Sequence, residues 1–274
     1  WAPLSADLER GLVYIPTNAP TIDYYGGFRP GDNLFGTSLI AIDVDTGQRV
    51  WHFQTVHHPI WNYDLPNVPI VVDVNVDGTD VPMVIQTTKQ GMTFAFNRET
   101  GEPVWPIEER PVPASIVPGE QLSETQPFPT NPAPLNPLGL TEDNIIDFTP
   151  ELKQEALEIM SQFRIGGPYI PPLPNNHTES VKGWVACGAG GLNITHPATL
   201  DPETGYLYQA NGQGCSGRTV RPGADADAEI HSCTSDSGDC TTTGATISDW
   251  VQGGGVGWSG PQGLPIYKPP YSKI

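Results

Sequence analysis

The sequence predicts an all-β chain of short strands joined by tight turns, with one short helix. Three observations lead to this class. Glycine and proline are abundant, at 30 residues each among 274; charged residues make up only 16% of the chain; and one turn motif recurs along it. Glycine and proline at this level suit a chain with many turns better than one with long helices. The chain is also long enough to bury a large core.

The turn motif occurs in two forms. Ala-x-Asp-x-x-Thr-Gly-x-x-x-Trp spans residues 41–51 and recurs, with Asn for Asp, over residues 95–105; Asp-x-Glu-x-Gly-x-x-Tyr spans residues 7–14 and 201–208. In each copy a strand would end at the Asp or Asn, and the glycine would supply the positive φ of a tight turn before the next strand. Repeated hairpins with a fixed tryptophan are typical of a β-propeller, in which the tryptophan docks between neighbouring blades.

Hydrophobic alternation between the turn signals places the individual strands. We expect strands over residues 11–16, 38–43, 49–55, 70–76, 82–87, 93–97, 198–200 and 206–209.

Two long insertions interrupt the repeats. Residues 1–105 are expected to form blades and residues 106–183 a proline-rich insertion; residues 184–211 would return to a blade, and residues 212–274 would form a Gly/Ser/Cys-rich loop insertion that leads into the next blade. The first insertion contains a predicted helix over residues 150–163, with Thr149 as its N-cap and Pro150 in its first turn. Loops of this length in a compact domain are usually functional or mobile.

Charge and cysteine content limit the partners and the compartment. A net charge of −18 at pH 7 argues against nucleic acid as a partner, because a polyanion would be repelled. The four cysteines, Cys187, Cys215, Cys233 and Cys240, permit two disulfides in an oxidising compartment. Three pairings are possible, and the short loop between Cys233 and Cys240 makes that pair our preferred disulfide.

Residues 53–66, Phe-Gln-Thr-Val-His-His-Pro-Ile-Trp-Asn-Tyr-Asp-Leu-Pro, follow the first repeat directly. Together with the repeats they resemble the pyrroloquinoline quinone (PQQ) dependent dehydrogenases, and most closely the branch of membrane-bound glucose dehydrogenase. The resemblance covers most of residues 1–110 and returns near residues 185–211. It implies about half of an eight-bladed propeller, so we expect a piece of a longer protein that needs its remaining blades.

The resemblance also implies a cofactor site. Trp1 matches the tryptophan on which the flat PQQ ring stacks, Lys89 matches the lysine that hydrogen-bonds the quinone oxygens, and Asn193 lies near a cofactor-contacting asparagine. A core tryptophan and a solvated surface lysine are the alternative interpretations. Asn18, Asn62 and Asp64 would bind Ca²⁺ or, as the alternative, a lanthanide ion, because such hard cations take amide and carboxylate oxygens.

Asn62 stands where this branch has its catalytic aspartate, and an amide cannot take a proton from an alcohol. Asp64 lies two residues on, so an extended segment would present both side chains to one pocket. Asp64 would then serve as base, as metal ligand or as both; a purely structural role is the alternative. His58 would orient substrate or share the proton, whereas the neighbouring His57 is expected to be a packed residue.

The resemblance implies oxidation of a sugar, polyol or alcohol by hydride transfer to PQQ with metal assistance. A quinone or cytochrome would accept the electrons. It further implies a periplasmic location, with any attachment to the inner membrane made by parts outside this chain. The rival hypothesis is a non-catalytic propeller scaffold, which the loss of the aspartate at Asn62 favours. A third is an active enzyme that uses Asp64 as its base.

Overall fold

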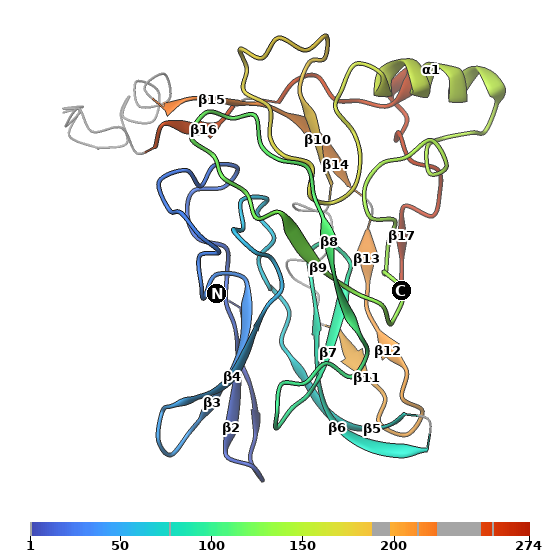
Figure 1. Ribbon diagram of the computed structural model, residues 1–274. Helices are drawn as coiled ribbons and strands as arrows, with labels where there is room; N and C mark the ends of the chain where they lie inside the picture. Colours follow the sequence, from blue (N-terminus) through green and yellow to red (C-terminus); the bar gives the residue numbers. More distant parts are fainter. Residues whose placement is uncertain (1, 77, 188–197, 213, 224–247, 254) are drawn as a thin grey trace, which may run out of the picture.

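The computed structural model describes residues 2–76, 78–187, 198–212, 214–223, 248–253 and 255–274. Figure 1 shows twisted antiparallel sheets side by side in its lower half, with the loops and helix α1 of the insertions above them. Within these ranges α1 is the single α-helix and the remaining elements are mostly strands, so the predicted fold class is confirmed. None of the helices in the described ranges is long and apolar enough to cross a membrane.

The first sheet contains four antiparallel strands in the order β1-β2-β3-β4. They are β1 (Ser5–Asp7), β2 (Leu12–Pro16), β3 (Ser38–Asp43) and β4 (Arg49–Gln54). Strands β2 to β4 lie within a residue or so of the predicted ranges, whereas the prediction did not include β1.

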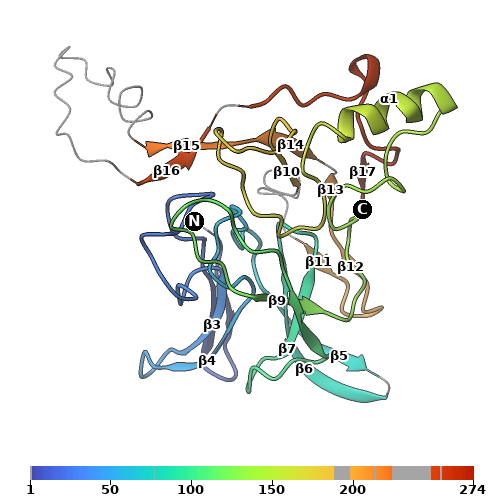
Figure 2. The ribbon, with the colours of Figure 1, turned by 45° about the horizontal axis from the view of Figure 1, so that its top comes forward.

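The second sheet contains β5 (Ile70–Val76), β6 (Thr79–Thr87) and β7 (Thr93–Asn97) in that order. The short hairpin of β11 (Thr199–Leu200) and β12 (Leu207–Tyr208) follows much later in the chain. In both views this hairpin lies beside the second sheet (Figures 1 and 2), and its leucines pack against that sheet's core.

The recurring turns close as the motif predicts. Gly47, Gly101 and Gly205 have φ of 68°, 75° and 72°, in the left-handed region that favours glycine. In each of these turns the glycine N–H donates to the carbonyl of the Asp or Asn that ends the strand. The side chain of that Asp or Asn also accepts hydrogen bonds from the turn, as Asp43 Oδ1 does from the Thr46 N–H at 2.8 Å. The repeat therefore encodes a hairpin turn at each site.

The tryptophan of the first repeat docks on the second. Trp51 is 7% exposed and packs against Tyr14 and Phe96, and its Nε1 donates to the Arg98 carbonyl at 3.0 Å. A Cβ at Gly101 would lie 2.7 Å from the ring of Trp51, so the second turn fits closely over the indole. Burying one such large apolar side chain contributes about 1.5–3 kcal/mol. Docking of Trp51 between neighbouring blades is therefore confirmed.

Trp105 of the second repeat is less tightly enclosed. It lines a cavity of about 170 Å³ together with Leu200, Gly205 and Leu207 of the β11–β12 hairpin. The second tryptophan thus faces the next hairpin, as the repeat predicts, but with looser packing than Trp51.

A buried arginine completes the junction between the two sheets. Arg98 donates from Nε to Asp7 Oδ2 at 2.7 Å and from Nη1 to Asp73 Oδ1 at 2.8 Å and the Val72 carbonyl at 2.9 Å. Its own carbonyl accepts from the hydroxyl of Tyr14 and from Trp51. Both ends of Arg98 are therefore tied to the first sheet.

The proline-rich insertion forms a two-stranded ribbon and a helix. The ribbon pairs β8 (Ile107–Pro111) with β9 (Thr125–Pro129), which the sequence did not predict. Helix α1 (Pro150–Met160) begins at the predicted residue and ends before the predicted Phe163. Thr149 caps it, with Oγ1 accepting from the Leu152 N–H at 3.2 Å.

Three short strand pairs and one 3₁₀ turn make up most of the remaining described elements. β10 (Trp184–Cys187) pairs with β14 (Cys215–Arg218) and β15 (Val220–Pro222) with β16 (Trp250–Gln252); β13 (Asn211–Gly212) pairs with β17 (Ser272–Lys273), and the 3₁₀ turn η1 spans Pro261–Gly263. A disulfide joins Cys187 to Cys215, which face each other across the β10–β14 pair. Our preferred pair, Cys233 and Cys240, lies outside the described residues.

Candidate functional site

The site forms around a buried ammonium group. Lys89 lies in the turn between β6 and β7 and is 3% exposed. Its Nζ donates to Asp64 Oδ2 at 2.7 Å, to Asn62 Oδ1 at 2.6 Å and to the Asn62 carbonyl at 3.0 Å. Burying a charge is tolerated where it is paired and hydrogen-bonded in this way. The structure thus brings together three residues that the sequence singled out.

Two side chains of segment 61–64 anchor it to the insertion, and the other two contact Lys89. Trp61 Nε1 donates to the Ile170 carbonyl at 2.8 Å, and the Tyr63 hydroxyl donates to the Pro168 carbonyl at 2.6 Å. The intervening Asn62 and the following Asp64 both accept from Lys89. Asn62 and Asp64 therefore meet at one ammonium, as expected, but Asn62 has a φ of 60°, so the segment is not extended as the prediction assumed.

A second carboxylate, Asp23, borders the site from the loop between β2 and β3. Its Oδ2 accepts from Asn62 Nδ2 at 2.8 Å. Burial, and then the negative charge of Asp64, raise the pKa of Asp23 above the ordinary value of 3.8. The amide of Asn62 therefore bridges an ammonium on its oxygen side and a carboxylate on its nitrogen side.

The β2–β3 loop reaches the site through its backbone as well. The Ala19 N–H donates to Asp64 Oδ1 at 2.9 Å, so both carboxylate oxygens of Asp64 accept a hydrogen bond. Asn18, the residue before Ala19, accepts at its carbonyl from the Thr37 N–H at 3.1 Å. The chain thus carries Asn18 to the border of the site, next to Asp64.

The histidine pair lies apart from the Lys89 cluster. The His58 ring is buried, with Nε2 at 2.8 Å from Glu120 Oε1 and Nδ1 at 2.6 Å from the Gly31 carbonyl. The two ring nitrogens of His57 lie within hydrogen-bonding distance of the side chains of Gln54 and Glu109. The structure does not bring His58 into contact with Asn62, Asp64 or Lys89. Two further predicted cofactor contacts, Trp1 and Asn193, lie outside the described residues.

Asp23 and Glu120 are the polar residues that the sequence reasoning missed. Neither belongs to a repeat or to residues 53–66, and each meets its partner only after folding. The one signal in the sequence is a lone acidic residue within an apolar or glycine-rich stretch, Ile22-Asp23-Tyr24 and Pro118-Gly119-Glu120. Such a residue is usually exposed in a turn, so this signal alone is weak.

The donors suit a hard cation and a quinone. Asn62 Oδ1, Asp64 and Asp23 offer the neutral and charged oxygens that Ca²⁺ and lanthanide ions take, with Asn18 nearby. Burial, and after it the charge of Asp64, raise the pKa of Asp23, and a bound cation would oppose both effects. Three or more His, Cys, Asp or Glu side chains do not converge on such a site among the described residues, so amides have to complete it. The Lys89 ammonium could donate a hydrogen bond to an electron-rich quinone oxygen.

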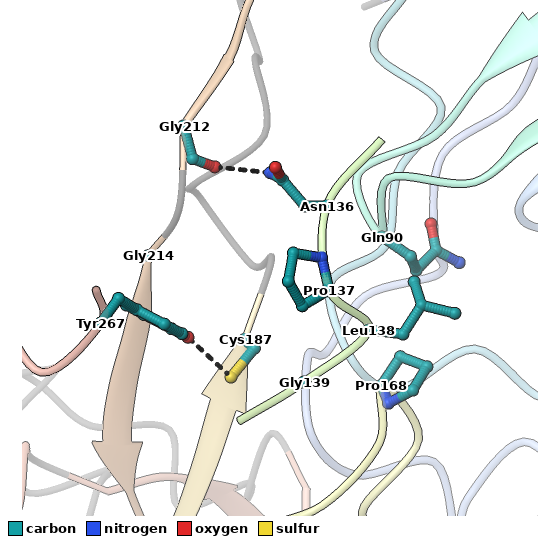
Figure 3. A pocket seen from close by; sticks show the side chains of 10 residues that line it. All are labelled: Gln90, Asn136, Pro137, Leu138, Gly139, Pro168, Cys187, Gly212, Gly214 and Tyr267. Atoms are coloured by element: carbon teal, nitrogen blue, oxygen red, sulfur yellow. Dashed lines mark hydrogen bonds between the residues drawn. The ribbon is translucent and has the colours of Figure 1, made fainter. Parts of the chain in front are cut away.

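A small cavity lies beside the cluster. It measures about 30 Å³ and is lined by Gln90, the neighbour of Lys89, and by Leu138, Pro168, Cys187 and Tyr267, among others (Figure 3). The Tyr267 hydroxyl lies 3.4 Å from Cys187 Sγ, and the Tyr63 hydroxyl contacts the Cys187 carbonyl at 3.0 Å. A space of this size has room for water rather than for a quinone. The β10 end of the disulfide is thereby packed against the segment that carries Asn62 and Asp64.

The sequence has curated relatives among dehydrogenases of hydroxyl-bearing compounds. It is 35% identical over 214 residues to the glycerol dehydrogenase large subunit of Gluconobacter thailandicus, covering 76% of this chain and 28% of that protein. It is 36% identical over 210 residues to quinate/shikimate dehydrogenase (quinone) of Acinetobacter baylyi (strain ATCC 33305 / BD413 / ADP1), covering 76% and 25%. With quinoprotein glucose dehydrogenase of Escherichia coli (strain K12) the identity is 40% over 129 residues, covering 47% and 16%. The chain thus spans about a quarter of the length of the first two relatives.

Among solved structures, a europium-containing methanol dehydrogenase matches with a TM-score of 0.51 at 18% identity, covering 92% of this chain and 33% of that one, which supports the fold alone. A family model described as PQQ: glucose/ethanol/alcohol dehydrogenase, beta-propeller domain matches residues 1–274. Its match over the full chain agrees with the docked repeats and with the cluster around Lys89. The chain therefore belongs to the PQQ-dependent glucose/ethanol/alcohol dehydrogenase β-propeller family.

Proposed function

We propose that this chain is part of a PQQ-dependent dehydrogenase that oxidises an alcohol, polyol or sugar, and that it contributes the Lys89 side of the active site. The observation that carries the proposal is the buried Lys89 ammonium, held at once by Asn62 and Asp64. A buried lysine with this much hydrogen bonding is rare in a purely structural setting, because the desolvation of its charge is costly.

Lys89, Asn62 and Asp64 would hold the cofactor and its cation. When bound, PQQ supplies a two-electron quinone acceptor, and its cation polarises the reacting oxygen as a Lewis acid. Lys89 presents a fixed positive charge where negative charge develops during reduction. Asn62 Oδ1 and Asp64 supply oxygen donors to the cation. Ca²⁺ is the proposed ion and a lanthanide is the alternative.

Proton removal from the substrate hydroxyl is assigned to Asp64. Asn62 cannot take this role, because an amide oxygen is a very weak base. Asp64 contacts the same ammonium as Asn62 and is 15% exposed at its side chain, so it is partly accessible. Lys89 contacts Asp64 Oδ2 and would hold the carboxylate in place beside Asn62.

The relatives support the substrate class and the electron acceptor. Their names specify glycerol, glucose and quinate, all of which carry hydroxyl groups on saturated carbon, and one name specifies a quinone as acceptor. We propose a polyhydroxylated substrate and a quinone or cytochrome acceptor for the intact protein. A periplasmic location and the need for the remaining propeller blades stay predictions.

Dye reduction by the intact protein tests the proposal. The protein would be reconstituted with PQQ and either Ca²⁺ or La³⁺ and assayed over a panel of sugars, polyols and alcohols. We expect turnover with at least one substrate, and the preferred ion identifies the cation. If the intact protein neither binds PQQ nor turns over any substrate with either ion, the proposal is wrong and the scaffold hypothesis replaces it.

Two substitutions test the assigned residues. Lys89→Met should lower kcat about 10²–10³-fold, as removal of one preorganised donor does. Asp64→Asn should lower kcat about 10²–10⁴-fold if Asp64 is the base. Lys153→Met on helix α1 is the matched control and should leave kcat unchanged. Equal activity of the Lys89 and Lys153 variants would remove Lys89 from the site, and full activity of Asp64→Asn would remove Asp64 as the base.

A further inference from the structure

A carboxylate of the proline-rich insertion is buried against the two segments that carry the site. Glu120 lies between β8 and β9 and is 8% exposed. Its Oε1 lies 2.8 Å from His58 Nε2, and its Oε2 accepts from the Gly26 N–H at 2.5 Å. Figure 2 shows the chain between β8 and β9 passing over the loop between β2 and β3. One side chain of the insertion therefore contacts two segments that are more than thirty residues apart in sequence.

These two segments carry the acidic and amide groups of the site. Gly26 follows Asp23 on the β2–β3 loop, and His58 precedes Asn62 and Asp64 on the loop after β4. The backbone joins them at one point, where the Tyr24 N–H donates to the Ile60 carbonyl at 2.5 Å. The contact between Asp23 and Asn62 thus depends on how these loops are held together.

Hydrogen bonds at both ring nitrogens fix the orientation of the His58 side chain. His58 Nδ1 faces the Gly31 carbonyl at 2.6 Å, and a carbonyl can only accept. His58 Nε2 faces the Glu120 carboxyl group. Nδ1 therefore carries a proton that it donates to the Gly31 carbonyl, and Nε2 lies at hydrogen-bonding distance from Glu120 Oε1.

Two further observations show that the surroundings of His58 hold its backbone in place. His58 has a φ of 44°, in the left-handed region that a residue other than glycine adopts only when its surroundings enforce it. Arg29, a half-buried charge on the β2–β3 loop, donates from Nη2 to the Pro59 carbonyl at 2.9 Å. Burial lowers the pKa of Arg29, and the negative charge of Glu120 offsets part of that change.

We propose that Glu120 is a positioning residue for the active site. Through His58 and Gly26 it fixes the spacing of the two loops, and so the placement of Asp23 against Asn62 and of Asn62 and Asp64 against Lys89. The insertion then belongs to the catalytic assembly, although none of its described residues contacts Lys89 through a polar group. This inference rests on the proposed dehydrogenase function for its kinetic part.

The expected effect is a loss of turnover rather than of substrate affinity. A displacement of about 1 Å in a reacting group, caused by a change far from the chemistry, can lower the rate about 10²-fold. Glu120→Gln preserves the shape of the side chain and removes its charge. It should therefore lower kcat by about tenfold to a hundredfold, with a change in KM of less than about threefold.

The experiment uses three variants of the intact protein: Glu120→Gln, His58→Gln and the double variant. Glu124→Gln is the matched control, because Glu124 lies in the same insertion and is exposed. Hydrogen–deuterium exchange of peptides covering residues 22–31 and 57–64 is measured alongside kcat and KM. We expect faster exchange in both peptides for both single variants and no further loss in the double variant, because the two residues act through one contact.

The exchange measurement needs no turnover, so it separates failure of the positioning role from failure of the dehydrogenase function. Unchanged exchange in both peptides for Glu120→Gln and His58→Gln would overturn the proposal. Faster exchange with a kcat equal to that of Glu124→Gln would also overturn it, because the loops would then move without consequence for the site.

Discussion

Substituting Gly101 with alanine should weaken the junction between the first two sheets. Gly101 has a φ of 75°, and its added Cβ would lie 2.7 Å from Cγ and Cδ2 of Trp51. Carbon atoms in favourable contact are about 3.5–4.0 Å apart, so the ring would have to move by about 1 Å. The indole cannot do so freely, because its Nε1 is bonded to the Arg98 carbonyl at 3.0 Å.

The magnitude follows from two contributions. A left-handed conformation costs a residue with a Cβ about 1–2 kcal/mol. Overpacking a filled site costs about 1–3 kcal/mol more. Gly101→Ala should therefore lower the free energy of unfolding by about 2–5 kcal/mol. Gly47→Ala provides the control: Gly47 stands at the same place in the first repeat with a φ of 68°, but no atom lies within 4 Å of its added Cβ.

Urea unfolding of the intact protein, followed by tryptophan fluorescence, measures both variants. The difference between them isolates the contact with Trp51 and should be about 1–3 kcal/mol. Equal losses of unfolding free energy in Gly101→Ala and Gly47→Ala would refute the reasoning, because the contact of the second turn with the Trp51 indole would then not limit stability.

Two further predictions concern stability. Burial alone would raise the pKa of Asp7, but the Arg10 N–H and the Arg98 guanidinium outweigh it and hold that pKa below 3.8. The stability from ionised Asp7 is therefore present above about pH 4 and lost as pH falls through the lowered pKa. Asp7→Asn should cost about 1.5–3 kcal/mol at pH 7 and flatten the decline in acid, measured by urea unfolding at several pH values; an unchanged acid profile would contradict this. Thr149→Ala should destabilise α1 by about 1 kcal/mol, seen as faster amide exchange in residues 150–160; unchanged exchange would show that the cap is unimportant.

The repeats made much of the two main sheets predictable. The Asp or Asn of each motif determines where a strand ends, so β3 and β7 have the predicted bounds. Hydrophobic alternation placed β5 correctly as well. The strands of the insertions were missed for a physical reason. Ribbon β8–β9 contains Pro111, Pro127 and Pro129, which argue against a strand, and β13 and β17 pair across a long stretch of chain that no local pattern connects.

The site was predictable where a motif carried it. Asn62, Asp64 and Lys89 were named from the resemblance and from their spacing, and the structure places them in one cluster. Asp23 and Glu120 were not, because their partners Asn62 and His58 are set by loop packing rather than by local sequence. The same packing places His58 away from the cluster, because its ring hydrogen-bonds Glu120 instead.

The junction at Arg98 has a consequence for assembly order. Repeated blades resemble one another, so apolar packing alone would let a blade stack against the wrong neighbour at little cost. Arg98 accepts a neighbour only if that neighbour supplies a carboxylate at Asp7, a hydroxyl at Tyr14 and an indole N–H at Trp51. A misplaced blade would leave Arg98 Nε without its carboxylate, at a cost of about 1–3 kcal/mol, whereas Nη1 would keep Asp73 and the Val72 carbonyl of its own sheet. The junction thereby favours the first sheet over other partners as the neighbour of the second.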